Sequence, residues 1–415
     1  MPGEPSTSRV VRDVLVPRSL LSWPEAFGGT EVQDCLRGDL VIEEDMSLRL
    51  KVSASGVYPR GLVMPKLCEP HVHLDKCHTI SRIGATGGSL QDAIAAQSED
   101  KGNWSAEDIR TRAGRGLREL AASGCGAVRS HVDWPHEESA KSPPTAWSVL
   151  RELAQEVAPE VALQLSPLLG VNDYAVPGVA DAMGKLLGGT DHALGCFVYD
   201  QPDRKEGIMA AFRTADRYGL ALDFHVDEGL EKGLDGLALI AEAAIETGFK
   251  GPILCGHACS LMNLTGDALA RRIERVAKAG ITVVALPSTN FYLQGRNGGT
   301  PDRLGITRVH ELLAGGVDVI IGTDNVQDAF CPLNRHDPRL SLSLAALGVH
   351  LDPLYGLHLP MITTRAEAAL GRTPRRIDDT PPDDLLIYQA TSTADFLCST
   401  ASPEPLFAAI ESRNP

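Results

Sequence analysis

Short apolar segments alternate with longer helical segments from about residue 61 onward. Each apolar segment is a few residues long and rich in Val, Ile or Leu, which is typical of strands buried on both faces. Eight such strands are predicted, at Gly61–Cys68, Gly126–His131, Val161–Pro167, Ala193–Tyr199, Leu220–His225, Pro252–His257, Ile281–Leu286 and Val317–Gly322.

Segments of helical length lie between these strands, and several end at a glycine just past the last helical residue. The regular alternation of strand and helix predicts an α/β protein built on a (β/α)8 TIM-like barrel. An open doubly wound sheet is the alternative, but no GxGxxG motif follows the first strand. The predicted helices are Ala106–Ser123, Ser148–Val157, Gly207–Tyr218, Gly236–Thr247, Asp267–Ala279 and Thr307–Ala314.

The two ends of the chain have a different pattern of apolar and turn-forming residues from the middle. Residues 10–60 read as short strands broken by glycine turns, and Leu385–Tyr388 reads as a strand that returns after the Pro- and Asp-rich segment Thr373–Asp384. We therefore predict a small β-sandwich domain formed from both chain termini, residues 1–60 and 373–415. The barrel is predicted to span residues 61–372.

The amino-acid composition limits the classes of molecule that the protein is expected to bind. The chain has 39 basic and 54 acidic residues, a net charge of −15, which argues against nucleic acid and against an anionic membrane. Nine cysteines without a CxxC motif favour a reducing compartment over a disulfide scaffold. Met1–Asp13 has no apolar signal core, and no stretch is long and apolar enough to span a bilayer. We expect a cytoplasmic protein that forms a homo-oligomer.

The ends of four predicted strands carry residues that bind metal ions. His71 and His73 alternate at the first strand end and therefore point to the same side. The fifth, sixth and eighth strands end at His225, His257 and Asp324, and a barrel places its active site at this rim. Three of these imidazoles and the carboxylate suit one divalent transition metal ion, such as zinc, iron or manganese. Such an ion makes hydroxide available at neutral pH.

A proton carrier is needed beside such a centre. Glu228 lies three residues past His225, where the strand runs into its loop, and can reach back over the metal. We predict that it takes the proton of water and passes it to a leaving group.

Several motifs together resemble the amidohydrolase superfamily, specifically its cytosine deaminase branch. They are Pro70–Lys76, Arg129–Asp133, His225–Glu228, Asn290–Arg296 and Gly305–Arg308. The resemblance implies that His71, His73, His225 and Asp324 are metal ligands. It also implies that Glu228 shuttles the proton, that His257 contacts hydroxide or substrate, and that Asp324 accepts a proton from water. Two-metal relatives use a lysine after strand four, which ends here at Val198-Tyr199-Asp200, so a single metal is predicted.

The segments that would recognise the substrate depart from that branch. A glutamine after strand three is replaced by the apolar Ser166–Gly170, and the second acid after strand eight is Asn325. Phe330 or Cys331 stands where the branch has tryptophan. The Thr323-Asp324-Asn325 segment is similar to that of the isopropylammelide amidohydrolases, which release an amine from a triazine ring. The predicted substrate-binding residues are Leu168, Leu169, Asn325, Phe330 and Gln294.

These observations lead to one main hypothesis and two alternatives. The main one is a metal-dependent hydrolase that deaminates a small neutral heterocycle with water, releasing ammonia; a cytosine-like pyrimidine, a triazine or a cyclic amidine would fit. The first alternative hydrolyses a cyclic amide or removes an alkylamine from a triazine. The second is a barrel that binds a ligand without catalysis, which the complete set of ligands and Glu228 disfavours.

Overall fold

The computed structural model describes residues 9–53, 56–135 and 142–410, and the strands in these ranges form three sheets. Two sheets are parallel, in the orders β6–β7–β8 and β13–β12–β11–β10–β9. Single parallel bridges link their edges, Gly170 to Phe197 on one side and Val72 to Asp324 on the other. The strands are β6 (Leu67–Val72), β7 (Cys125–Asp133), β8 (Ala162–Leu168), β9 (Ala193–Val198), β10 (Ala221–Val226), β11 (Ile253–His257), β12 (Ile281–Ala285) and β13 (Val319–Ile321).

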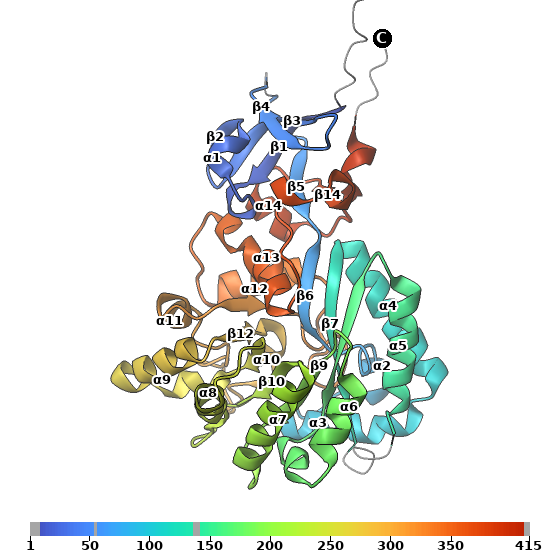
Figure 1. Ribbon diagram of the computed structural model, residues 1–415, viewed down its shortest axis with the longest axis vertical. Helices are drawn as coiled ribbons and strands as arrows, with labels where there is room; N and C mark the ends of the chain where they lie inside the picture. Colours follow the sequence, from blue (N-terminus) through green and yellow to red (C-terminus); the bar gives the residue numbers. More distant parts are fainter. Residues whose placement is uncertain (1–8, 54–55, 136–141, 411–415) are drawn as a thin grey trace, which may run out of the picture.

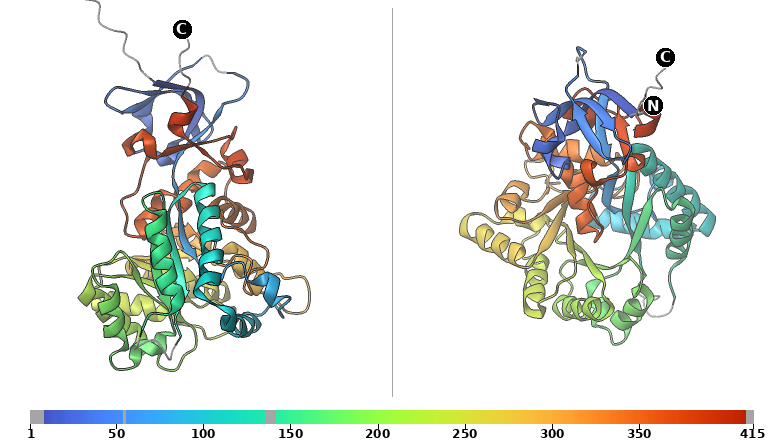
Figure 2. Two further views of the ribbon diagram at one scale, coloured as in Figure 1. Left: turned by 90° about the vertical axis from the view of Figure 1, so that its right-hand side faces the viewer. Right: turned by 45° about the horizontal axis from the view of Figure 1, so that its top comes forward.

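Helices follow these strands and surround them, which gives the TIM-barrel-like α/β arrangement that the sequence alternation predicted (Figures 1 and 2). Two predicted helices, α4 and α8, have the predicted bounds. The helices are α2 (Ile80–Ile83), α3 (Leu90–Asp100), α4 (Ala106–Ser123), α5 (Thr145–Val157), α6 (Val179–Leu187), α7 (Arg204–Tyr218), α8 (Gly236–Thr247), α9 (Gly266–Lys278), α10 (Pro287–Leu293), α11 (Val309–Ala314), α12 (Pro338–Gly348) and α13 (Thr364–Ala369). None of the helices in the described ranges is both long and apolar enough to cross a bilayer.

The third sheet combines both ends of the chain, in the order β15–β14–β5–β1–β3–β2 with β4 beside β3. It lies at one end of the molecule, and β6 runs away from it, so the carboxyl ends of the parallel strands lie at the far end (Figure 1). Its elements are β1 (Arg9–Pro17), α1 (Pro24–Phe27), β2 (Thr30–Val32), β3 (Cys35–Ile42), β4 (Leu48–Lys51), β5 (Gly61–Pro65), β14 (Leu385–Tyr388), α14 (Thr393–Cys398) and β15 (Glu404–Pro405).

The predicted first strand, Gly61–Cys68, is two strands in the structure. Its first half, β5, pairs with β1 and β14 in the terminal sheet, and its second half begins β6, which pairs with β7. The chain changes sheet at Lys66, the residue between them. The prediction of one strand was wrong because the apolar run is unbroken apart from this residue, and both halves are buried in different sheets.

Side chains inside the ring of parallel strands form layers. An apolar cluster contains residues from β6, β7, β11, β12 and β13 together with Ala366, Ala369 and Leu370 of α13 and its end. Next to it lies a polar layer in which Arg129 donates to Gln164 Oε1 at 2.8 Å and to Asp223 Oδ2 at 3.0 Å, all three being buried. Since buried charges are costly unless they are paired, this layer fixes β7, β8 and β10 relative to one another.

Glu119 of α4 joins the first and last parts of the ring. Its Oε2 lies 2.8 Å from Nδ1 of the buried His336, which precedes α12, and 3.3 Å from Nε2 of His78. Burial acts to raise the pKa of Glu119, but hydrogen bonds from His336 and Arg115 outweigh it and hold the pKa at about 2. Because an unfolded glutamate has a pKa of about 4.3, this contact stabilises the fold above about pH 5 and is lost as the pH falls towards 2.

We expect Glu119→Gln to lower the Tm at pH 7, because a charge-assisted hydrogen bond contributes roughly 1.5–3 kcal/mol. The difference from the wild type should shrink as the pH falls from 5 towards 2, because the carboxylate becomes protonated first in the unfolded chain and then, near pH 2, in the folded protein. Thermal melting across this pH range measures it, with Glu274→Gln on the exposed face of α9 as the matched control. A Tm difference that stays constant with pH would contradict the assignment.

Candidate metal and active site

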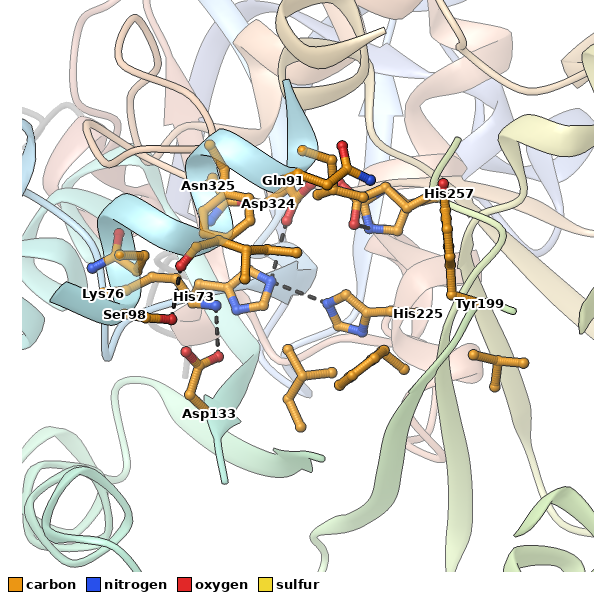
Figure 3. Close-up of a pocket in the computed structure, with 18 of the residues that line it drawn as sticks. His73, Lys76, Gln91, Ser98, Asp133, Tyr199, His225, His257, Asp324 and Asn325 are labelled. Atoms are coloured by element: carbon orange, nitrogen blue, oxygen red, sulfur yellow. Dashed lines mark hydrogen bonds and ion pairs between the residues drawn. The ribbon is translucent and has the colours of Figure 1, made fainter. Parts of the chain in front are cut away.

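A cavity of about 360 Å³ opens at the carboxyl ends of the parallel strands. This volume is at the lower end of the range found for small-molecule sites. Its floor contains His73, His225, His257 and Asp324, and its walls are largely apolar (Figure 3). The apolar side chains come from several loops and from α3, and include Leu90, Ile94, Trp134, Leu168, Phe197, Val198 and Phe330.

The structure brings the predicted histidines together at the floor. His225 Nε2 lies 3.1 Å from His73 Nε2, and His73 Nε2 lies 3.3 Å from Asp324 Oδ1 (Figure 3). His71 Nε2 is 3.6 Å from the same carboxylate oxygen. His71 also groups with His257 and Asp324, each offering a ligand atom within 4.8 Å of the others. Residues from β6, β10, β11 and the end of β13 therefore meet at one point.

Most of these groups lack hydrogen bonds to one another, and a metal ion would satisfy them. Both ring nitrogens of His71, Nδ1 of His225 and both carboxylate oxygens of Asp324 are buried without a hydrogen-bond partner among the described residues. Such groups are costly to bury unless a ligand satisfies them. Several neutral imidazoles with one carboxylate form a donor set that suits a divalent transition metal.

Burial keeps these imidazoles neutral. It lowers the pKa of His71 and His225 well below the usual value, and neighbouring imidazoles add to the effect. The pKa of His73 is lowered in the same way by burial and by the nearby Lys76. A neutral imidazole keeps a free lone pair, which is the form that coordinates a metal.

Glu69 holds β6 against the segment that follows β13. Its Oε1 accepts backbone hydrogen bonds from His71 and Thr323, both at 3.0 Å, and its Oε2 accepts one from the Thr323 hydroxyl. The Asp324 amide donates to the His71 carbonyl at 2.8 Å. Asp324 itself has φ of 65°, a left-handed conformation uncommon outside glycine, which the surrounding hydrogen bonds stabilise.

His131, which lies within the Arg129–Asp133 motif, is a further member of the cluster. Its ring lies 4.0 Å from that of His71 and 4.4 Å from that of His225, measured between centroids. Its Nε2 is 3.1 Å from Asp223 Oδ1, so the Arg129–Asp223 pair beneath also orients this ring. The signal was the alternation of Arg129 and His131 at the end of a buried strand, the same spacing as in His71 and His73.

Glu228 faces the cluster from the loop after β10. Its Oε2 lies 3.5 Å from Nε2 of His257, and its side chain is 17% exposed, towards the cavity. Burial and the charge of Asp324 raise its pKa well above the usual value. The preceding Asp227 anchors the loop by accepting hydrogen bonds from the Ser260 hydroxyl at 2.7 Å and the Gly236 amide at 2.9 Å.

His257 differs from the other imidazoles because its second nitrogen has a partner. Asn290 Nδ2 lies 3.1 Å from His257 Nδ1. With Asn290 as the donor, the ring proton of His257 lies on Nε2 and points to Glu228. Burial lowers the pKa of His257 to about 4, so the ring is neutral.

The predicted substrate-binding residues lie in different places. Leu168, Asn325 and Phe330 line the cavity, whereas Leu169 and Gln294 are buried outside its lining. Gln294 Nε2 donates to the Glu228 carbonyl at 3.2 Å, and so contacts the loop behind the site. Asn325 Nδ2 donates to Asp328 Oδ2 at 2.7 Å.

Two groups of cavity residues were not predicted to line the site, although Asp133 and Lys76 lie within motifs singled out in the sequence. Asp133 pairs with Lys76 at 2.6 Å and with Lys101 at 2.8 Å at the side of the cavity. The helix α3, which no apolar periodicity predicted, contributes Gln91, Ile94, Gln97 and Ser98. Gln91 and Ser98 are labelled in Figure 3.

Comparisons with known proteins agree with this geometry. Residues 86–345, more than half of the chain, match the family described as the amidohydrolase family. The pterin deaminase of Rhizobium rhizogenes strain K84 is 33% identical over 390 residues, which cover 89% of this chain and 86% of that protein. The N-isopropylammelide isopropyl amidohydrolase of Pseudomonas sp. strain ADP is 21% identical over 349 residues, which cover 80% and 81%.

A crystal structure of 5-methylcytosine deaminase from Klebsiella pneumoniae, with phosphonocytosine bound, shares the fold. Its TM-score is 0.77 at 23% identity, and the match covers 94% of this chain and 95% of that chain. This chain is therefore an amidohydrolase-type hydrolase acting on C–N bonds. It belongs to the amidohydrolase family, in a superfamily that is metal-dependent.

Proposed function

We propose that this protein is a mononuclear metal-dependent deaminase that hydrolyses the amino group from a small neutral nitrogen heterocycle and releases ammonia. The observation that carries the proposal is the position of Glu228, 3.5 Å from His257 and facing a buried cluster of imidazoles and Asp324. Among heterocycles we favour a bicyclic pterin over a cytosine-like pyrimidine. Support comes from the pterin deaminase that shares 33% identity across most of both chains.

The metal would be held by His71, His73, His225 and Asp324. A zinc, iron or manganese ion bound there supplies a Lewis acid that lowers the pKa of water and makes a nucleophile available at neutral pH. The end of β9 supports a single metal, since Phe197, Val198 and Tyr199 offer no lysine for a second ion.

The proton transfers are assigned to two carboxylates. Asp324 accepts a proton from the attacking water. Glu228, protonated at the start, protonates the ring nitrogen next to the attacked carbon. It then takes the remaining proton from the added oxygen and delivers it to the departing amine as the carbonyl forms, so it acts as a general acid and base. Transfer of the proton held by Asp324 back to Glu228 completes the cycle. His257 donates from Nε2 to the oxygen on which negative charge develops, and Asn290 holds the ring in the required tautomer.

The cavity suits a neutral ring. Trp134, Leu168 and Phe330 provide apolar walls for a planar heterocycle, and the charge of Asp133 is balanced by Lys76 and Lys101. Homo-oligomerisation and a cytoplasmic location stay predictions from the sequence.

We also propose that the two parallel sheets make one closed (β/α)8 barrel and that both chain ends form a small β-sandwich domain beside it. The bridges from Gly170 to Phe197 and from Val72 to Asp324 support closure. The pairing of β14 with β5 supports the shared terminal domain. We place the start of the barrel after Lys66, slightly later than residue 61.

We expect Glu228→Gln to reduce kcat for heterocycle deamination by about 10²–10⁴-fold, because the amide cannot carry the proton. Metal content should stay at the wild-type level, since Glu228 is not assigned as a ligand. Ammonia release and elemental analysis measure the two effects. The matched control is Glu231→Gln, an exposed residue of the same loop, and turnover of the Glu228 variant within a few fold of the control would refute the mechanism.

Removal of the metal by a chelator should abolish turnover and lower the Tm, because an ion that binds only the folded state stabilises it. Adding back zinc, iron or manganese should restore activity, and the purified protein should contain one ion per chain. His225→Asn should lower metal content, whereas His350→Asn on the exposed surface should not. Full activity in metal-free protein would contradict the proposal.

A second candidate function is release of an alkylamine from an N-alkylamino triazine, or hydrolysis of a cyclic amide. The relative named for N-isopropylammelide, at 21% identity, favours testing the alkylamine reaction. We expect one molecule of free ammonia for each molecule of product, measured together by an ammonia assay and mass spectrometry. Product with alkylamine or with an opened ring, and without ammonia, would replace the deaminase assignment with this alternative.

A further inference from the structure

The helix α3 covers the cavity with one of its faces. It begins at a capping box, in which the Ser89 hydroxyl accepts from the Asp92 amide and the Asp92 side chain accepts from the Ser89 amide. Gln91, Ile94 and Gln97 are spaced three residues apart, so they lie on the same side of the helix, and all three line the cavity.

Gln97 is the unusual residue on this face. It is 2% exposed, yet neither its Oε1 nor its Nε2 has a hydrogen-bond partner among the described residues. Gln91, one turn and a half earlier, is exposed and can bond to water. A buried amide with both ends unpaired destabilises the fold, and native structures rarely keep one without a function.

The neighbouring wall of the cavity holds a similar group. Trp134, which follows β7, is 5% exposed, and its Nε1 has no partner among the described residues. Two other polar groups that line the cavity are already occupied: Asp133 pairs with two lysines, and Asn325 donates to Asp328. Gln97 and Trp134 therefore supply the cavity with two unused kinds of donor and one unused acceptor.

We propose that Gln97 determines specificity by reading a lactam edge of the substrate, a carbonyl group beside a ring N–H. This inference rests on the proposed function. Gln97 Nε2 donates to the ring carbonyl while Gln97 Oε1 accepts from the ring N–H, and Trp134 Nε1 donates to a ring nitrogen or oxygen. The amide group is complementary to this edge at both of its ends.

The position of Gln97 also accounts for the apolar end of β8. Leu168 lies there and offers no amide to the substrate, so a reader of the lactam has to come from another element. Gln97 comes from α3, a segment between β6 and α4, and so approaches the heterocycle from a different wall. The substrate class is a planar lactam-containing heterocycle such as pterin, with its amino-bearing carbon towards Glu228.

The test compares wild type with Gln97→Met, an unbranched substitution of similar length without hydrogen-bonding groups. Two substrates are used: pterin, and its 4-O-methyl ether, which lacks the ring N–H. For the wild type, kcat/KM should be about 100-fold higher with pterin, since a site built to bond a polar edge rejects analogues that lack it. In the Gln97→Met variant, kcat/KM for pterin should fall while kcat/KM for the ether stays at the wild-type value. Most of the preference for pterin should therefore be lost.

Substrate-free protein gives a second readout that needs no turnover. Gln97→Met should raise the Tm, because it removes an unpaired buried amide, whereas Gln155→Met at an exposed position of α5 should not. A Tm that is lower or unchanged in the Gln97 variant overturns the inference, and so does an equal loss of rate with both substrates. Failure of the wild type to release ammonia from pterin counts against the proposed function alone, since the Tm comparison still decides the role of Gln97.

Discussion

The site depends on how the first and last parallel strands are joined. Glu69 accepts hydrogen bonds from His71, two residues away, and from Thr323, 254 positions along the chain. Burial raises the pKa of this carboxyl group to about 7, and the bonds from Thr323 and His71 act against that shift. The same contacts place Asp324 beside His71 and His73. The contacts between β6 and the segment after β13 therefore also bring the candidate metal-binding groups together.

The layers inside the ring of strands determine the electrostatic state of the site. An apolar cluster excludes water from one end, and the Arg129–Asp223 pair forms a charged but internally balanced layer above it. The imidazoles lie next to this layer and are buried, so protonation would add charge where solvent cannot stabilise it. The rings are therefore neutral, and their free lone pairs lie where the candidate metal ion would be bound.

The positions of the candidate site residues could be predicted from the sequence because each lies at or just after the end of a short buried strand. The alternation of His71 and His73, and the positions of His225, His257 and Asp324 after later strands, follow from the two-residue period of a strand and the shared rim of parallel strands. The change of sheet at Lys66 could not be predicted, because one apolar run supplies two buried strands. The sequence pattern also did not predict α3 or its part in the site. Polar residues of this helix face the cavity, so the helix lacks the continuous apolar face by which a buried helix is usually recognised.

The strands and the segments that cover them contribute different parts of the site. Backbone hydrogen bonds of the parallel strands hold His71, His225 and Asp324 in place. A shift of any one of these residues would break such bonds and leave buried backbone groups unpaired. The walls are set by loops and by α3, whose small cluster with Leu293 and Ala329 is separate from the main core. Changes in those walls cost little stability. In this chain the strand ends therefore carry the candidate hydrolytic residues, while the loops and α3 provide the walls of the cavity.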